Sequence, residues 1–172
     1  MKRAAVLACA FAFLLQSAVL PAAAKRVSDS TGVISVELPK GWRVEKNLTD
    51  CQKLNLIGAS HSGLVSNIGL VTKNARNLTL DIIAKGIEKN PSILDPGCKI
   101  VSHGKTKLGG VPALVYVCES APVPKTTTSQ FETVIAIKGR TVYLLSYSAS
   151  KAFFREDRPA FETVTKSLKW VK

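Results

Sequence analysis

Two glycine-containing dipeptides, each set between runs rich in β-branched and aromatic residues, constrain the fold of this chain most strongly. Gly109-Gly110 lies within the segment 99–119, and Gly139-Arg140 lies within the segment 131–148. A two-residue turn between such runs is typical of a β-hairpin, because glycine adopts the positive φ angles that a tight turn needs. The sequence therefore predicts two antiparallel hairpins in the second half of the chain.

Three shorter strands are expected before these hairpins. Residues 32–39 alternate apolar and polar side chains and stop at Pro39. Residues 54–59 and 64–72 form two further candidate strands around a loop at 58–63 that contains glycine at both ends. Alternation of this kind is typical of strands with one buried face. Together with the hairpins, these strands predict one antiparallel sheet.

Two segments have helical periodicity. Residues 79–90 place their apolar residues on one stripe, with Thr79 as the expected N-terminal cap and Asn90-Pro91 as the end. The C-terminal segment is expected to be a helix with Asp157 as its cap and Pro159 in its first turn. Its apolar face comprises Phe154, Phe161, Val164 and Leu168. Helices packed on an antiparallel sheet give an α+β fold in a single domain.

The first two dozen residues have the three parts of a secretory signal peptide. Lys2 and Arg3 are followed by an uncharged run over 4–20, and residues 21–24 supply the small side chains that signal peptidase reads. We therefore expect cleavage before Lys25. Residues 1–24 are interpreted as the signal peptide, and residues 25–172 as one domain that is periplasmic or secreted.

The mature domain is strongly basic. Loss of Lys2 and Arg3 with the signal peptide lowers the formal net charge from +12 to +10. Such a charge attracts anionic surfaces at low ionic strength. The lysines are scattered along the chain, without the basic runs or aromatic motifs of nucleic-acid-binding proteins, so nucleic acid is not expected as a partner. An envelope or secreted protein is the expected partner, with weak attraction to an anionic membrane surface.

Three cysteines follow the signal peptide, which predicts one disulfide and one spare thiol in an oxidising compartment. Cys98 and Cys118 flank the open end of the first predicted hairpin and are the candidate pair, which leaves Cys51 as the free thiol. A two-residue turn would place Cys118 opposite Val101, three positions from Cys98. A longer loop or a bulge at Pro112 would bring the two together. A bond from Cys51 to either one is the main alternative.

No residue pattern predicts catalysis, a cofactor or a metal. The most suggestive cluster is Ser60-His61-Ser62, with His103, Asp81 and Asp95 elsewhere in the chain. The sequence lacks the Gly-x-Ser-x-Gly and His-Glu-x-x-His motifs, and its two histidines do not show zinc-ligand spacing. We therefore expect a protein that is not an enzyme, with no catalytic, cofactor-binding or metal-binding residues.

Several segments, in order, resemble the PsbP-like family. The strand and turn at 32–42 are similar to the entry of that fold, and 108–113, 143–145 and 161–168 match later parts of it. The resemblance implies an α/β/α sandwich with a central antiparallel sheet and a C-terminal helix packed on it. It also implies a family that is mostly non-enzymatic and often binds or steadies a partner. It transfers no active site to this chain.

Two hypotheses of function follow. The first is a non-enzymatic periplasmic or secreted binding or accessory protein, whose sheet edges or loops hold a partner. The alternative is a small-molecule carrier or an enzyme that uses a pocket between sheet and helix. That second class needs convergent polar groups around a cavity, which only a structure can reveal.

Overall fold

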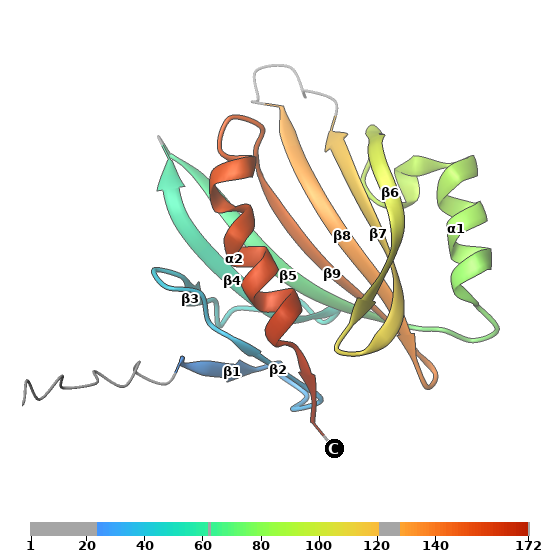
Figure 1. Cartoon of the computed structure of the whole chain (residues 1–172), viewed down its shortest axis with the longest axis horizontal. Helices are drawn as coiled ribbons and strands as arrows, with labels where there is room; N and C mark the ends of the chain where they lie inside the picture. Colours follow the sequence, from blue (N-terminus) through green and yellow to red (C-terminus); the bar gives the residue numbers. More distant parts are fainter. Residues whose placement is uncertain (1–23, 62, 121–127, 172) are drawn as a thin grey trace, which may run out of the picture.

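The centre of the molecule is a seven-stranded antiparallel sheet (Figure 1). The computed structural model describes residues 24–61, 63–120 and 128–171, so the expected signal peptide lies outside the described residues except for Ala24. Neighbouring strands follow the order β3-β4-β5-β9-β8-β7-β6. Their bounds are β3 Arg43–Val44, β4 Gln52–His61, β5 Leu64–Asn74, β6 Cys98–Leu108, β7 Val111–Ser120, β8 Ser129–Lys138 and β9 Thr141–Ser150. β6 is therefore one edge of the sheet, and the short β3 lies at the other.

Both predicted two-residue hairpins are confirmed. Leu108 pairs with Val111 across the first turn, which contains only Gly109 and Gly110. These glycines have φ angles of 54° and 84°, and Gly139, the first turn residue of the second hairpin, has a φ of 60°. Positive φ at the turn residues matches the right-handed twist of the paired strands. The turn sequences thus set the register of the β6–β7 and β8–β9 pairs next to each turn.

The expectation of a loop over 58–63 is wrong, because the strands of the first hairpin extend further toward their turn. β4 continues to His61 and β5 begins at Leu64. Gly58 lies inside β4, where an added Cβ would stand 2.7 Å from the ring of Trp42. Glycine at this position therefore gives room to a packed tryptophan and does not form a turn.

The helix predicted over 79–90 is confirmed as α1 (Leu80–Lys89). The Thr79 hydroxyl accepts a hydrogen bond from the Ile82 amide at 3.2 Å, as expected for an N-terminal cap. Asn90 is the C-cap, and a short 3₁₀ turn η1 (Pro91–Ile93) follows it. α1 packs on one face of the sheet through its buried Ile87 and its partly buried neighbours.

The C-terminal helix α2 (Phe154–Ser167) starts earlier than predicted. Phe153 is its N-cap residue, so the expectation that Asp157 caps the helix and that Pro159 lies in its first turn is wrong. The helix begins early because Phe154 is buried against the sheet, where its carbonyl accepts a hydrogen bond from the Tyr147 hydroxyl at 2.9 Å. Burial of a large apolar side chain outweighs the capping preference of an aspartate three residues later.

A second, three-stranded sheet joins the N-terminal segment to the C-terminal one. It comprises β1 (Arg26–Ser28), β2 (Ile34–Glu37) and β10 (Lys169–Trp170), with β2 in the centre. Trp170 Nε1 donates a hydrogen bond to the Gly109 carbonyl at 3.0 Å, which links this small sheet to a hairpin turn of the large one. Ile34 and Val36 of β2 belong to the same buried cluster as Phe161 and Val164 of α2, so the small sheet and α2 lie on the same side of the central sheet.

Helices on opposite faces of the sheet confirm the predicted α/β/α sandwich (Figure 1). Alternate side chains of the strands point to opposite faces, so each face has its own apolar cluster. The α2 side is built around Ile68, Leu70, Leu145, Tyr147, Phe161 and Val164. The α1 side is built around Ile87, Leu114, Tyr116, Phe131, Ile135 and Val142. Within the described residues, neither helix is long and apolar enough to cross a membrane.

Candidate functional site

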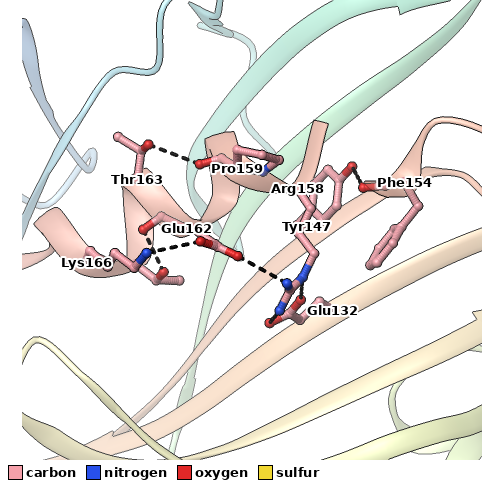
Figure 2. Close-up of polar contacts among 9 residues, drawn as sticks. Glu132, Tyr147, Phe154, Arg158, Pro159, Glu162, Thr163 and Lys166 are labelled. Atoms are coloured by element: carbon pink, nitrogen blue, oxygen red, sulfur yellow. Dashed lines mark hydrogen bonds and ion pairs between the residues drawn. The ribbon is translucent and has the colours of Figure 1, made fainter. Parts of the chain in front are cut away.

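A buried carboxylate lies beneath α2 on the central strand β8. Glu132 is 7% exposed and lies within the buried stretch 131–136 of β8. Arg158 reaches down from α2, and its Nε donates a hydrogen bond to Glu132 Oε2 at 2.7 Å (Figure 2). A buried carboxylate is costly unless it is paired and hydrogen-bonded. Arg158 therefore pairs with the only acidic side chain that is buried in the described strands of the central sheet.

The same guanidinium also joins a chain of charges on the surface of α2. Arg158 Nη1 donates to Glu162 at 3.1 Å, and Lys166 Nζ donates to the second oxygen of Glu162 at 3.0 Å (Figure 2). The hydrogen bond to Glu132 raises the pKa of Arg158, and the hydrogen bond from Lys166 lowers the pKa of Glu162. Both acids of this network are thus bound by basic side chains of α2.

Of three hollows that the described residues form beside α2, Arg158 lines two, and the third lies between the helix and the turn at 39–42. The first has a volume of about 430 Å³ and lies between Arg155 on the helix and Ser102 and Val117 on β6 and β7. The second has a volume of about 370 Å³ and includes Lys105 on β6. Because they share a lining residue, we treat them as one feature, the α2 groove. It runs along the helix above the β6–β7 hairpin.

The α2 groove carries an excess of positive charge. Its basic lining residues are Lys105, Lys107, Arg155, Arg158 and Lys166, and its acidic ones are Glu132 and Glu162. The two acids are bonded to Arg158 and Lys166. Lys105, Lys107 and Arg155 are exposed and form no ion pair within the described part of the chain. The groove is therefore suited to an anionic ligand.

In the Ser60-His61-Ser62 cluster singled out in the sequence, Ser62 lies outside the described residues, and His61 makes contacts that join two elements of the fold. His61 Nε2 lies 3.0 Å from Asp157 Oδ2, and the Ser66 hydroxyl donates to the same oxygen at 2.5 Å. A hydrolytic triad requires the histidine between the serine and the carboxylate, whereas here the carboxylate lies between the other two. Ser66 is only 2% exposed. The His61 ring also stacks on Phe153 at 4.2 Å, so the cluster ties the β4–β5 hairpin to the start of α2.

The other polar residues of the candidate catalytic set do not join His61. Asp81 lies in the first turn of α1, and Asp95 accepts a hydrogen bond from the Ser120 hydroxyl at 2.7 Å. His103 stacks on Tyr116 on β7. Within residues 24–61, 63–120 and 128–171, no three His, Cys, Asp or Glu side chains are arranged to hold a metal ion.

A β-bulge brings the two hairpin cysteines closer than a regular ladder would. Cys118 lies opposite Ile100, and the register shifts between Ile100 and Ser102. The bulge therefore lies on β6 and not at Pro112, where the sequence suggested it. It places Cys98 and Cys118 as diagonal neighbours on one face of the sheet.

All three described cysteines are free thiols in this structure. Cys51 is exposed, Cys98 is partly buried and Cys118 is buried, and burial raises the pKa of the Cys98 and Cys118 thiols. Diagonal cross-strand neighbours are about 7 to 8 Å apart, more than a disulfide spans, so a bond requires the end of β6 to shift toward β7. The Cys98–Cys118 pairing stays a prediction.

No sequence motif predicted the groove or its central ion pair. One signal was present: Glu132 falls at a core-facing position in the apolar run 131–137. A charged residue in such a position requires a partner, and arginine is the side chain best able to provide it. The sequence did not indicate that Arg158 is that partner, because 26 residues and a hairpin separate the two.

The layered architecture is that of the PsbP-like fold. Cyanobacterial PsbP (CyanoP) from Synechocystis superposes with a TM-score of 0.60 at 11% sequence identity, over 90% of this chain and 96% of that one. The fold that the sequence resemblance implied is therefore confirmed.

A second solved structure has the same fold. LpqN from Mycobacterium tuberculosis, described as involved in cell envelope biogenesis, superposes with a TM-score of 0.61 at 15% identity, over 88% of this chain and 87% of that one. Identities this low show the fold alone. No protein-family model matches the chain, and no curated protein matches it in sequence.

Proposed function

We propose that this chain is a non-enzymatic accessory protein that acts outside the cytoplasm and holds an acidic segment of a partner protein in the α2 groove. One observation carries the proposal: the acids of the groove are paired internally, while Lys105, Lys107 and Arg155 on its walls have no ion-pair partner in the described part of the chain. Unpaired cations around a groove attract and orient an anionic partner.

The shape and surroundings of the groove favour a protein segment over a membrane surface. Basic surfaces that bind membranes usually combine lysines with exposed apolar side chains that enter the lipid. None of the exposed large apolar residues of the described chain lines the α2 groove. The two hollows of the groove lie one after the other along α2. This arrangement suits an extended segment of a partner protein with acidic side chains at intervals.

Two observations support the proposed compartment and the accessory role. The sequence of residues 1–24 has the pattern of a cleavable signal peptide. One protein of the same fold, LpqN, is described as involved in cell envelope biogenesis. N-terminal sequencing of protein recovered from the producing cell is expected to begin at Lys25. Recovery of cytosolic protein that retains Met1 would contradict the proposed location.

Binding of an acidic peptide tests the groove itself. The probe is a fluorescein-labelled decapeptide of alternating glutamate and glycine, and the readout is fluorescence anisotropy at 0.15 M salt, where the Debye length is about 8 Å. We expect saturable binding that the double variant Arg155→Glu/Lys105→Glu weakens at least tenfold, because it reverses one charge in each hollow.

The matched control is Lys46→Glu/Lys85→Glu, which changes the net charge equally at exposed positions outside the groove. This variant should keep at least half of the wild-type affinity. Equal weakening by both double variants would mean that the attraction depends on net charge only and would contradict a binding groove. An absence of saturable binding by the wild-type protein would contradict it as well.

A further inference from the structure

Another hollow lies on the opposite face of the sheet, beyond the end of α1. It has a volume of about 320 Å³, and Leu94 and Asp95, directly after η1, form one wall. Its remaining lining is mainly hydroxyl and amide side chains from four strands, namely Asn67, Ser120, Ser129, Thr133, Ser146 and Ser148. The ring of Phe131 lines it as well. We call this feature the hydroxyl pocket.

The polar groups of the hydroxyl pocket are already positioned by bonds to one another. The Ser120 hydroxyl donates to Asp95 at 2.7 Å, and the Ser148 hydroxyl donates to Asn67 Oδ1 at 3.3 Å. Thr133 and Ser146 share a hydrogen bond of 2.9 Å between their hydroxyl oxygens. Each of these hydroxyls still has lone pairs that can accept, and the Asn67 amide group has two N–H donors. The pocket thus offers both donors and acceptors, held in place.

The described lining disfavours two classes of ligand. Among the described residues, no lysine or arginine lines this hollow, although the formal net charge of the chain is +12, and Asp95 is the sole charged group. An anion would therefore meet a carboxylate without a compensating cation. A metal ion would find one carboxylate and no cluster of strong ligands in the described part of the chain.

We propose that the hydroxyl pocket binds a neutral carbohydrate. The hydroxyls of a sugar donate and accept hydrogen bonds in the same way as the Ser and Thr side chains of the pocket. The Phe131 ring and Leu94 provide an apolar surface for the C–H face of a pyranose ring. The volume is at the lower end of the roughly 300 to 1,000 Å³ typical of ligand sites, which fits one or two sugar rings.

This site is independent of the α2 groove, because the two lie on opposite faces of the sheet. Asp95 and Thr133 belong to the side that faces α1, whereas Glu132 and Arg158 belong to the side that faces α2. Sugar binding and acidic-peptide binding are measured with different probes and different variants. The failure of one proposal is therefore distinguishable from the failure of the other.

Chemical-shift mapping tests the proposal on the mature domain. The probes are maltose and N,N′-diacetylchitobiose, each added to ¹⁵N-labelled protein up to roughly 50 mM, which exceeds the millimolar dissociation constants expected of a shallow site. We expect at least one of them to cause saturable shifts that concentrate on the amides of residues 67, 95, 120, 133 and 146. Glucose 6-phosphate should cause weaker shifts at these amides, because its phosphate meets Asp95.

Two variants and one control keep the test decisive. Asp95→Asn and Thr133→Val should each weaken sugar binding at least fivefold. The control Ser92→Ala removes an exposed hydroxyl of η1 that does not line the pocket, and it should leave sugar binding unchanged. The spectrum of each variant without sugar shows whether the fold is retained. Absence of saturable shifts with both sugars, or shifts that folded Asp95→Asn and Thr133→Val variants leave unchanged, would overturn the proposal.

Discussion

Replacement of Arg158 by methionine tests how the buried carboxylate of β8 is stabilised. Arg158→Met keeps the apolar stem of the side chain but removes the guanidinium, so the Glu132 carboxylate, whose side chain is 9% exposed, loses its ion-pair partner. Removal of one partner of a buried ion pair costs about 3 to 5 kcal/mol. The Arg158 side chain is itself 43% exposed, so the pair is only partly desolvated. We therefore expect a loss of about 2 kcal/mol in the free energy of unfolding.

Urea denaturation and thermal melting measure this loss. For a domain of this size, about 2 kcal/mol corresponds to a fall in Tm of roughly 4 to 8 °C. The double variant Glu132→Gln/Arg158→Met should be more stable than Arg158→Met alone, because it removes the uncompensated charge. Lys166→Met, which affects only the exposed partner Glu162, should cost less than about 0.5 kcal/mol. Equal stability of Arg158→Met and Lys166→Met would refute this account of the Glu132 site.

Two further predictions concern a turn and the thiols. Gly109 and Gly139 both have positive φ, but of these two positions only Gly109 would bring an added Cβ against other side chains, at 2.7 Å. Gly109→Ala should therefore destabilise the protein by about 1 to 3 kcal/mol more than Gly139→Ala, as measured by urea denaturation. Equal losses would mean that backbone strain alone decides the cost. Non-reducing peptide mapping of freshly isolated protein should show a Cys98–Cys118 bond with Cys51 alkylatable, and three alkylatable thiols would contradict the pairing. After reduction, burial keeps the pKa of the Cys98 and Cys118 thiols high, so the exposed Cys51 should be alkylated first near pH 7.5, with Cys98 becoming more reactive as the pH rises.

The parts of the fold that short-range patterns determine could be predicted. The turns at Gly109-Gly110 and Gly139-Arg140 determine the register of four long strands, and Thr79 with Asn90 bounds α1. In these cases, the residues that determine the structure are neighbours in sequence.

Long-range packing explains the parts that could not be predicted. The sequence predicts a loop at Gly58, but this glycine lies within a strand and leaves room for the ring of Trp42. The sequence predicts Asp157 as a helix cap, but Asp157 binds His61 and Ser66 from the β4–β5 hairpin. In both cases the deciding partner lies on a distant segment, which local sequence does not reveal.

The candidate site was the least predictable feature. Glu132 and Arg158 are remote in sequence, and each alone is an ordinary residue in its own segment. The hydroxyl pocket is similarly assembled from side chains such as Asn67, Ser120 and Ser146, which no motif connects. Only the order of the strands in the sheet places these residues together.

Site-specific photocrosslinking in the producing cell tests the central claim, that the α2 groove holds an acidic protein segment, most directly. A photoreactive phenylalanine analogue replaces Thr106, which lines the groove, or Ser92 on the opposite side of the domain as a control. We predict that Thr106 crosslinks to a peptide with several Asp or Glu residues, and that Arg155→Glu/Lys105→Glu abolishes this product while Lys46→Glu/Lys85→Glu does not. Crosslinks to lipid or to peptides without acidic residues, or the same product from Ser92, would contradict the claim.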